Sequence, residues 1–386
     1  MRLLLISNGH GEDLSGALLA LALQELGAQV AAVPLVGGGD AYLAAGISVL
    51  GRTRNYSTGG LGYTSAAGRW AEIFQGQVLY LLKRSWRVWR EAQKADALVV
   101  VGDVIPVLLC WLLGKPVATY LVAYSSHYEG KLRLPWPCGA CLASKRTRAI
   151  FSRDYLTASD LSEQLGRSVE FLGNPFIEKV LGAKAKPSAA QMLALLPGSR
   201  LPEALQNFEL MLALLELLPK TAQSWSFKAA LVQELNQEAV AAMALQRGWS
   251  ASPSALNWQQ LKLELCWGQF NQVLCESRVA LSMAGTASEQ AVGLGIPVLQ
   301  LAGFGPQFTA GFAEAQRRLL GPGVFCAQGP VGAATTLEQS VQLLIPLMTK
   351  QTENQQQSWQ EEGEKRLGRS GGTNRIATAI IQAMQR

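Results

Sequence analysis

Short apolar runs alternate with longer stretches of helical periodicity along the first half of the chain. The run at residues 2–6 is followed by a helical stretch at 14–26, and the same alternation continues to residue 172. An apolar run of about four to eight residues is typical of a strand buried on both faces, and its alternation with helices predicts a parallel sheet. The strands that we expect lie at 2–6, 29–36, 97–101, 116–122, 149–152 and 169–172, with a long helix at 69–94.

The same pattern restarts after a segment rich in Gly, Ala and Lys at residues 182–190, which we interpret as a linker. The chain has 386 residues, more than the roughly 100 to 200 that one domain usually holds. We therefore predict an α/β protein of two Rossmann-like, doubly wound parallel-sheet domains. The first is expected at 1–182 and the second at 188–368, and a C-terminal helix at 369–386 is expected to pack back on the first. The second-half strands are expected at 192–196, 227–232, 279–283, 297–301 and 324–326.

The composition is that of a folded protein kept in a reducing compartment. It is 49% hydrophobic and 16% charged, which excludes a disordered chain. The six cysteines have no regular spacing, and we interpret the lone CxxC of Cys138 and Cys141 as ordinary packing. The most apolar stretch, 97–113, is interrupted by Asp103 and Pro106 and is shorter than the roughly 20 residues that span a bilayer. We expect a cytoplasmic protein.

Positive charge is concentrated in the first half. Residues 52–153 hold 15 Lys and Arg against 5 Asp and Glu, together with five of the ten tryptophans. In the helix expected at 69–94, apolar and basic side chains recur at helical spacing, which suits a helix lying on the inner face of an anionic membrane. A solvated basic helix with core tryptophans explains the same pattern, so both interpretations stay open; we expect no nucleic-acid partner. The residues concerned are Leu79, Leu82, Trp86 and Trp89 on the apolar side and Lys83, Arg84, Arg87 and Arg90 on the basic side.

One strand end in the second half reads Pro-Gly-Ser-Arg, directly after the strand at 192–196. Ligands of doubly wound sheets bind outside the carboxyl ends of the strands. Gly198, Ser199 and Arg200 offer backbone N–H groups and a guanidinium there, and these groups suit phosphate oxygens. The motif is short, and many turns carry similar residues.

A second strand end, after 279–283, leads through Gly285 and Thr286 into a helix that carries Glu289. Glycine allows the backbone to approach a diphosphate closely, and a helix N-terminus favours its negative charge. A carboxylate such as Glu289 can bind the two hydroxyls of a ribose. The segment therefore predicts a nucleotide-diphosphate site, although an ordinary crossover between two strands has the same pattern.

The first half offers acidic residues and a histidine after its strands. Asp103 follows the strand at 97–101, and His127 follows the next one, where we expect a structural role. No GxGxxG, GxxxxGK[ST] or DxD motif occurs, which disfavours a nicotinamide site, a P-loop and a metal-bridged diphosphate. The segment at the end of the first strand, residues 7–13, reads SNGHGED, and its candidate site residues are Gly9, His10, Gly11, Glu12 and Asp13.

Taken in order, the motifs resemble those of a known group of enzymes. The segments SNGHGED, PLVGGGDAYLAAGI, GNP, LLPGSRLPE and GTASEQAVGLGIPV are similar to those of the lipid-A-disaccharide synthase group of glycosyltransferases, and more closely of its related-protein branch. The resemblance covers nearly the whole chain. It implies a GT-B architecture with an interdomain cleft, no metal or other cofactor, a UDP-sugar donor held by the second domain, and a lipid or lipid-linked sugar acceptor.

The resemblance also implies roles for individual residues. Gly198, Ser199 and Arg200, with Gly285 and Thr286, would hold the diphosphate. Glu289 would bind the ribose, and Gln307 falls where related enzymes use Gln or Asn near the donor sugar. Gly9, Gly11 and Asp13 belong to the loop expected on the acceptor side.

The first loop departs from the synthase proper, which carries SGExSGD where this chain has SNGHGED. A transferring enzyme needs a base for the acceptor hydroxyl, and His10 has a suitable pKa without tuning. Asp103 and Glu12 are the other candidates, and Asp13 is alternatively an N-cap for a helix beginning at Leu14. Two other functions stay open on the same fold: a UDP-sugar 2-epimerase and a non-catalytic binding protein.

Overall fold

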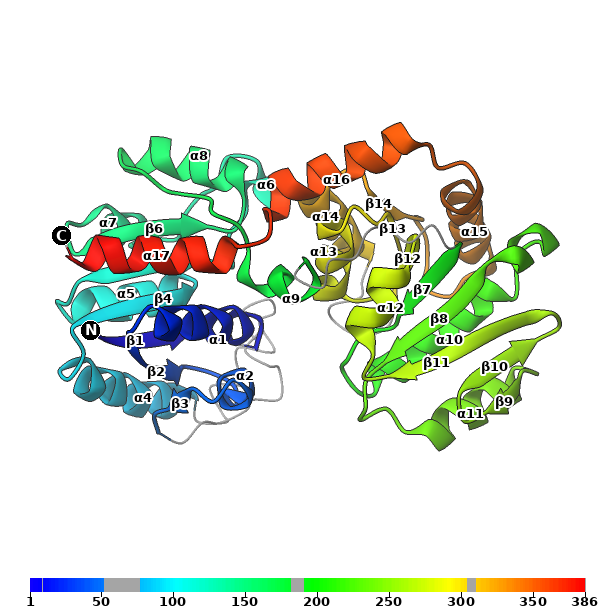
Figure 1. Cartoon of the computed structure of the whole chain (residues 1–386), viewed down its shortest axis with the longest axis horizontal. Coiled ribbons are helices and arrows are strands. Elements are labelled where there is room, and N and C mark those ends of the chain that lie inside the picture. Colours follow the sequence, from blue (N-terminus) through cyan, green and yellow to red (C-terminus); the bar gives the residue numbers. More distant parts are fainter. Residues whose placement is uncertain (9, 52–76, 182–190, 304–309, 386) are drawn as a thin grey trace. The chain divides into compact units, whose positions relative to one another are not determined.

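The structure is a computed structural model that describes residues 1–8, 10–51, 77–181, 191–303 and 310–385. Two compact units make up the chain, and each is described by itself (Figure 1). The first comprises Met1–Glu178 together with Gly368–Arg386, and the second comprises Lys179–Leu367. The expected boundaries at 182 and 368 lie close to these divisions.

A six-stranded parallel sheet forms the centre of the first unit, in the order β3-β2-β1-β4-β5-β6. Leu3 pairs with Val30 of one neighbouring strand and with Ala97 of the other, so β1 lies between β2 and β4. The strand order runs outward in both directions from β1 and β4, whose carboxyl ends therefore form the topological switch point. The strands are β1 (Arg2–Ser7), β2 (Gln29–Pro34), β3 (Ser48–Val49), β4 (Ala97–Gly102), β5 (Val117–Leu121) and β6 (Thr147–Ser152).

Helices cover both faces of this sheet. The described ones are α1 (His10–Glu25), α2 (Asp40–Ala44), α4 (Gln77–Ala92), α5 (Val104–Leu112), α6 (Ser126–Glu129), α7 (Cys138–Ala143), α8 (Tyr155–Leu165), the 3-10 helix η2 (Pro175–Ile177) and α17 (Gly372–Gln385). Successive side chains of a strand point to opposite faces. Leu3 and Leu5 of β1 face the core that α1 and α17 complete, whereas Leu4 and Ile6 face the core of α4, α5 and α7.

The second unit is built on an eight-stranded sheet in the order β14-β13-β12-β7-β8-β11-β10-β9. Its strands from β14 to β11 are parallel, and β10 and β9 add an antiparallel edge. The switch point lies between β7 and β12. The strands are β7 (Met192–Leu196), β8 (Ser226–Leu231), β9 (Ser250–Ser252), β10 (Ala255–Trp258), β11 (Leu261–Trp267), β12 (Val279–Ser282), β13 (Val298–Gln300) and β14 (Val324–Cys326).

The helices of the second unit pack on this sheet with fully buried side chains such as Phe208 and Leu344. They are α10 (Glu203–Leu215), η3 (Lys220–Ser224), α11 (Gln237–Gln246), α12 (Phe270–Glu276), α13 (Gly285–Gly293), α14 (Ala310–Leu320), α15 (Ala334–Thr349) and α16 (Glu353–Leu367), while α9 (Glu178–Leu181) begins at the division between the units. A Cβ on Gly363 of α16 would lie 2.2 Å from the Val292 carbonyl oxygen of α13. Only glycine allows these two helices to approach so closely.

Three sequence predictions need correction. The segment 169–172 forms no strand, because Glu170 makes only an isolated bridge to Phe151. The strands β3, β9, β10 and β11 were not predicted, although Leu261–Trp267 alternates apolar and polar residues as a half-buried strand does. The helix expected from Leu14 begins at His10, so the segment after β1 is mostly helical. The expected helix at 69–94 is described from Gln77 onward, as α4.

The C-terminal helix α17 belongs to the first unit. Ile376 and Ile380 are fully buried in the core that α1 shares. Glu178 caps the start of the helix, because its two carboxylate oxygens accept hydrogen bonds from the backbone N–H groups of Gly371 (3.0 Å) and Thr373 (3.3 Å). The hydrogen bonds of Glu178 therefore join the end of the unit's first segment, Met1–Glu178, to the start of its second segment, Gly368–Arg386.

Candidate functional site

The switch point of the first sheet carries an acidic side chain held by hydrogen bonds. Asp103 follows β4 and is the N-cap of α5, because its Oδ1 accepts from the Ile105 backbone N–H at 2.9 Å. Its Oδ2 accepts from the Asn8 side-chain amide at 2.8 Å, which joins the ends of β1 and β4. Burial raises the pKa of Asp103, and these hydrogen bonds oppose the rise. A carboxyl group of this kind is suited to proton transfer.

Glu12 lies in the first turn of α1, close to Asp103. Burial raises the pKa of Glu12, the charge of Asp103 raises it further, and the Arg153 guanidinium lowers it. Arg153 follows β6, is only 8% exposed, and donates from Nη1 to the Val122 carbonyl oxygen at 3.2 Å. The first unit thus brings two acidic groups and a buried cation to one edge of its sheet.

Asp13 has a structural environment. The Tyr42 hydroxyl donates to Ser7 Oγ at 2.8 Å, and Ser7 Oγ donates to Asp13 Oδ1 at 2.6 Å, all three side chains being buried. The expectation that Asp13 caps a helix from Leu14 is wrong. Asp13 lies in the first turn of a helix that has already begun, where its bond to Ser7 fastens that turn to β1.

Other members of the SNGHGED segment are described less fully. His10 and Gly11 form the start of α1, and their side-chain surroundings lie outside the described part of the structure. Gly9 lies outside the described residues. His10 therefore stays a prediction as a catalytic base, and Gly9 and Gly11 stay predictions as acceptor-side residues.

In the second unit, the Pro-Gly-Ser-Arg segment follows β7 at the switch point. Gly198 has a φ of 100°, a conformation that favours glycine, and Ser199 and Arg200 follow it on the surface. The fully buried Asn207 of α10 fixes this turn, since its Nδ2 donates to the Pro197 carbonyl oxygen at 3.0 Å. The turn presents its polar groups at the edge of the sheet.

The neighbouring strand β12 leads into α13, which begins at Gly285 and Thr286. Its N-cap residue is Ala284, so no side chain caps the first N–H groups of this helix. Below it, Ser288 Oγ donates to the Ala284 carbonyl oxygen at 2.7 Å and accepts from Gln300 Nε2 at 3.1 Å. The backbone N–H groups at the start of α13 are therefore held in fixed positions, where they can bind an anion.

Glu289 and Gln307 were predicted to contact the donor. Glu289 lies one turn into α13 and is buried, with polar contacts of its own. Gln307 lies outside the described residues. Both roles stay predictions.

The two cysteines of the CxxC motif lie at the start and within α7 and are buried. Burial raises the pKa of Cys138 to about 12 and also raises that of Cys141. Both are protonated thiols near neutral pH, packed in the core. Within the described ranges, no three His, Cys, Asp or Glu side chains gather closely enough to hold a metal ion.

Solved structures share this fold over almost their whole length. The calicheamicin glycosyltransferase CalG4 covers 100% of this chain and 99% of its own at 17% identity, with a TM-score of 0.64. The UDP-GlcNAc 2-epimerase of Neisseria meningitidis, solved with UDP-GlcNAc bound, covers 100% of both chains at 15% identity and a TM-score of 0.54. The spinosyn rhamnosyltransferase SpnG, complexed with thymidine diphosphate, matches over 100% of both chains at 16% identity, with a TM-score of 0.57.

No protein-family model matches the chain, and no curated protein matches its sequence. The structural likeness confirms the predicted fold class, two α/β units with parallel sheets of the GT-B type. Glycosyltransferases and UDP-GlcNAc 2-epimerases both have this fold.

Proposed function

We propose that the protein is a glycosyltransferase that moves a hexose from a UDP-sugar to a hydroxyl of a lipid or lipid-linked sugar in glycolipid biosynthesis. One observation carries this proposal: segments 198–200 and 285–286, both predicted to bind a diphosphate, follow neighbouring strands at the switch point of the second sheet. The resemblance to the lipid-A-disaccharide synthase group and the nucleotides bound to two structural neighbours support it.

In this proposal the second unit binds the donor. The N–H groups at the start of α13 and the Arg200 guanidinium contact the diphosphate, and Glu289 contacts the ribose. As the bond from the sugar C1 to the phosphate oxygen breaks, negative charge grows on the departing UDP. Fixed N–H donors stabilise that charge without rearranging. The transfer then needs no metal.

The first unit supplies the acceptor side. The acceptor oxygen attacks C1, and its proton passes to a base at the carboxyl edge of the first sheet. Asp103 and Glu12 have raised pKa values that bring them nearer to neutral pH, and His10 is the third candidate. The buried Arg153 offsets part of the negative charge that two ionised carboxylates create.

A second candidate function is UDP-sugar 2-epimerisation. The likeness to the Neisseria enzyme covers both chains completely, and further UDP-GlcNAc 2-epimerases share the fold, so the solved structures support epimerisation better than transfer to a lipid. Epimerisation removes a proton at C2 and returns it to the other face, so it also needs acid–base groups beside a bound diphosphate. The same two switch points would serve this reaction.

With a lipid as acceptor, we propose that α4 contacts the membrane surface. Trp86 and Trp89 are 58% and 50% exposed, and the Arg90 guanidinium carbon lies 5.2 Å from the Trp86 ring centroid. Buried Glu91 pairs with Lys94 at 2.9 Å, which offsets part of the positive charge of this surface. We expect both tryptophans to enter the interface of an anionic bilayer. No helix among the described residues is long and apolar enough to cross a membrane.

A panel of UDP-sugars tests the proposal. The protein is incubated with UDP-glucose, UDP-galactose and UDP-GlcNAc in D2O, with and without a lipid extract, and UDP release and the products are measured. Transfer predicts UDP release that the lipids accelerate. Epimerisation predicts a 2-epimer with deuterium at C2 and little UDP release. No turnover and no stabilisation by UDP, in a protein shown to be folded, would refute both.

A further inference from the structure

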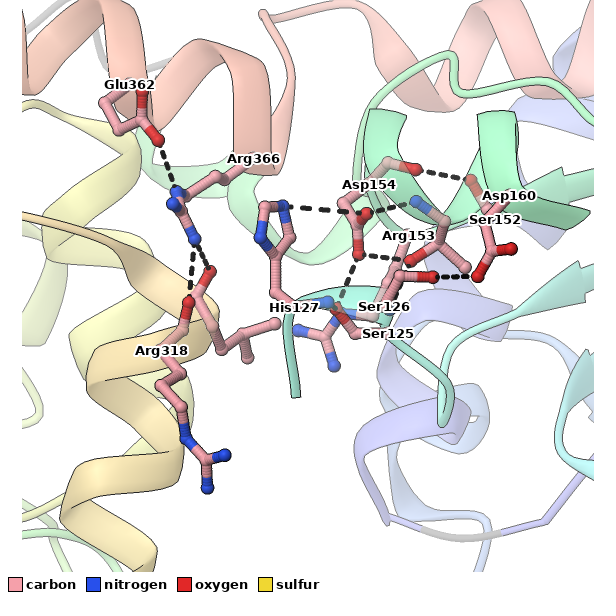
Figure 2. Close-up of polar contacts among 12 residues, drawn as sticks. Ser125, Ser126, His127, Ser152, Arg153, Asp154, Asp160, Arg318, Glu362 and Arg366 are labelled. Carbon is pink, nitrogen blue, oxygen red and sulfur yellow. Dashed lines mark hydrogen bonds and ion pairs between the residues drawn. The ribbon is translucent and has the colours of Figure 1, made fainter. Parts of the chain in front are cut away.

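The segment that follows β5 is held rigidly by one helix. Ser125 Oγ donates to Asp154 Oδ2 at 2.8 Å, and Ser126 Oγ donates to Asp160 Oδ2 at 2.9 Å (Figure 2). The Ser126 backbone N–H donates to Thr157 Oγ1 at 2.9 Å. Asp154 is the N-cap of α8, and the other two acceptors lie on that helix. This segment includes the short helix α6, and a segment fixed by this many side chains presents its other groups in a defined geometry.

The short helix α6 in this segment carries His127 to the side of Asp154. The His127 Nε2 atom lies 3.9 Å from Asp154 Oδ1, and the imidazole is 18% exposed while Asp154 is 1% exposed (Figure 2). Asp154 also accepts from the Thr157 backbone N–H (2.7 Å) and hydroxyl (2.8 Å), so its position is fixed. A carboxylate beside one ring nitrogen orients a histidine for acid–base work, and such contacts are often long before substrate binds.

Tyr124 of the same segment also reaches the Asp103 edge of the sheet. The Tyr124 hydroxyl oxygen accepts a hydrogen bond from the Val104 backbone N–H at 3.1 Å, directly beside Asp103. Strands β4 and β5 are neighbours, so Asp103 and the segment that holds His127 both follow the carboxyl ends of adjacent strands. The sequence already placed His127 after the strand next to that of Asp103, but the contact of Tyr124 with Val104 is evident only from the structure.

We propose that His127, oriented by Asp154, is an acid–base residue of the first unit that takes the proton of the attacking hydroxyl. This inference rests on the proposed function. The acceptor O–H bond breaks and its proton binds an imidazole nitrogen, the acceptor oxygen bonds to C1, and the electrons of the C1–oxygen bond leave with UDP. Asp154 stabilises the imidazolium, and solvent then takes the proton. In this assignment, Asp103 and Glu12 orient the acceptor.

Kinetics of three variants test the assignment, with the UDP-sugar panel as substrate. His127→Gln keeps a hydrogen-bonding side chain but cannot carry the proton, so kcat should fall by about 100-fold or more while KM and the Kd for UDP change by less than about twofold. Asp154→Asn keeps the helix cap and should lower kcat by about tenfold. Glu163→Gln, an exposed acid on the same helix, is the matched control and should retain full activity.

A purely structural role would lower Tm and leave kcat of the folded protein unchanged. A His127→Gln protein with kcat within threefold of wild type would overturn the inference alone. A wild-type protein that neither turns over a UDP-sugar nor binds UDP would overturn the proposed function instead.

The pairing of His127 with Asp154 is also measurable without activity. The chain has only two histidines, so His10→Gln leaves one imidazole for ¹⁵N NMR. Adding Asp154→Asn should change the tautomer balance that the His127 nitrogen shifts report. Identical spectra for the single and the double variant would show that Asp154 does not orient His127, and the inference would fail.

Discussion

The two switch points differ in what they present. At the first, side chains from several strand ends meet: Asp103 after β4, Asn8 after β1, Arg153 after β6 and Glu12 on α1. At the second, the polar groups of segments 198–200 and 285–286 are largely backbone N–H groups, with one guanidinium. Side chains that meet only after folding suit proton handling, whereas backbone donors at a helix start suit a fixed anionic group. The difference suggests a division of labour between acceptor chemistry and donor binding.

The largest effect is expected when acid–base capacity is removed from the first unit. Asp103→Asn keeps the size of the side chain and one hydrogen-bond acceptor but removes the carboxylate. If Asp103 handles the proton itself, kcat for UDP-sugar turnover should fall by about 10² to 10⁴-fold with the Kd for UDP unchanged. If Asp103 only orients the acceptor, as the assignment of His127 requires, KM for the acceptor should rise more than kcat falls. Steady-state kinetics alongside UDP calorimetry distinguish the two results.

A second change tests whether the first switch point depends on the buried hydrogen bonds that join Tyr42, Ser7 and Asp13. A Cβ on Gly16 of α1 would lie 2.0 Å from the Tyr42 hydroxyl oxygen, the group that donates to Ser7. Gly16→Ala should therefore displace Tyr42 and destabilise the protein by about 2–4 kcal/mol in denaturant unfolding. The matched control is Gly139→Ala in α7, where the added Cβ would come no closer than 3.9 Å to a neighbouring atom and no positive φ adds strain. Equal loss in both variants would show that the Tyr42 contact is unimportant.

A third change weakens the second switch point. Arg200 is exposed, so its guanidinium is accessible to a ligand. Arg200→Ala should weaken UDP binding by about 10- to 100-fold, since a hydrogen bond to a charged group contributes roughly 1.5–3 kcal/mol. Arg278→Ala, a control in the same unit placed before β12, should bind UDP as wild type does. Unchanged UDP affinity in Arg200→Ala would remove this residue from the donor site.

The smallest expected effect concerns the ionisation of Glu12. Its folded-state pKa is raised by burial, so the folded protein holds this proton more tightly than the unfolded chain. Stability from this group is present at low pH and is lost as pH rises through the folded-state pKa. Glu12→Gln should therefore raise Tm at pH 7 by at most about 4 °C and have little effect near pH 4. A Tm difference independent of pH would contradict the raised pKa.

The sequence predicts the second switch point better than the first. Gly285 and Thr286 follow an apolar run and begin a helix, so their position at a strand end is readable from local pattern. Arg153 was missed because its approach to Glu12 depends on the order of the strands, which no local pattern contains. The only available signal was an Arg-Asp pair directly after an apolar run.

Two other differences have local causes. The glycines of the SNGHGED segment indicated a loop, but a helix tolerates glycine in its first turn, and α1 begins at His10. The edge strands β9 (SAS) and β10 (ALNW) are short and mix polar with apolar residues, so they lack the longer apolar run that identified the central strands.

Binding of UDP distinguishes the roles of the two switch points. Calorimetry is performed on the wild type, on Asp103→Asn and on Gly285→Val, which places a branched side chain at the start of α13. We expect equal Kd values for UDP in the wild type and Asp103→Asn. We expect a Gly285→Val protein of normal Tm to bind no UDP. Failure of the wild type to bind UDP, or binding that Asp103→Asn abolishes and Gly285→Val leaves intact, would contradict the division of labour between the two switch points.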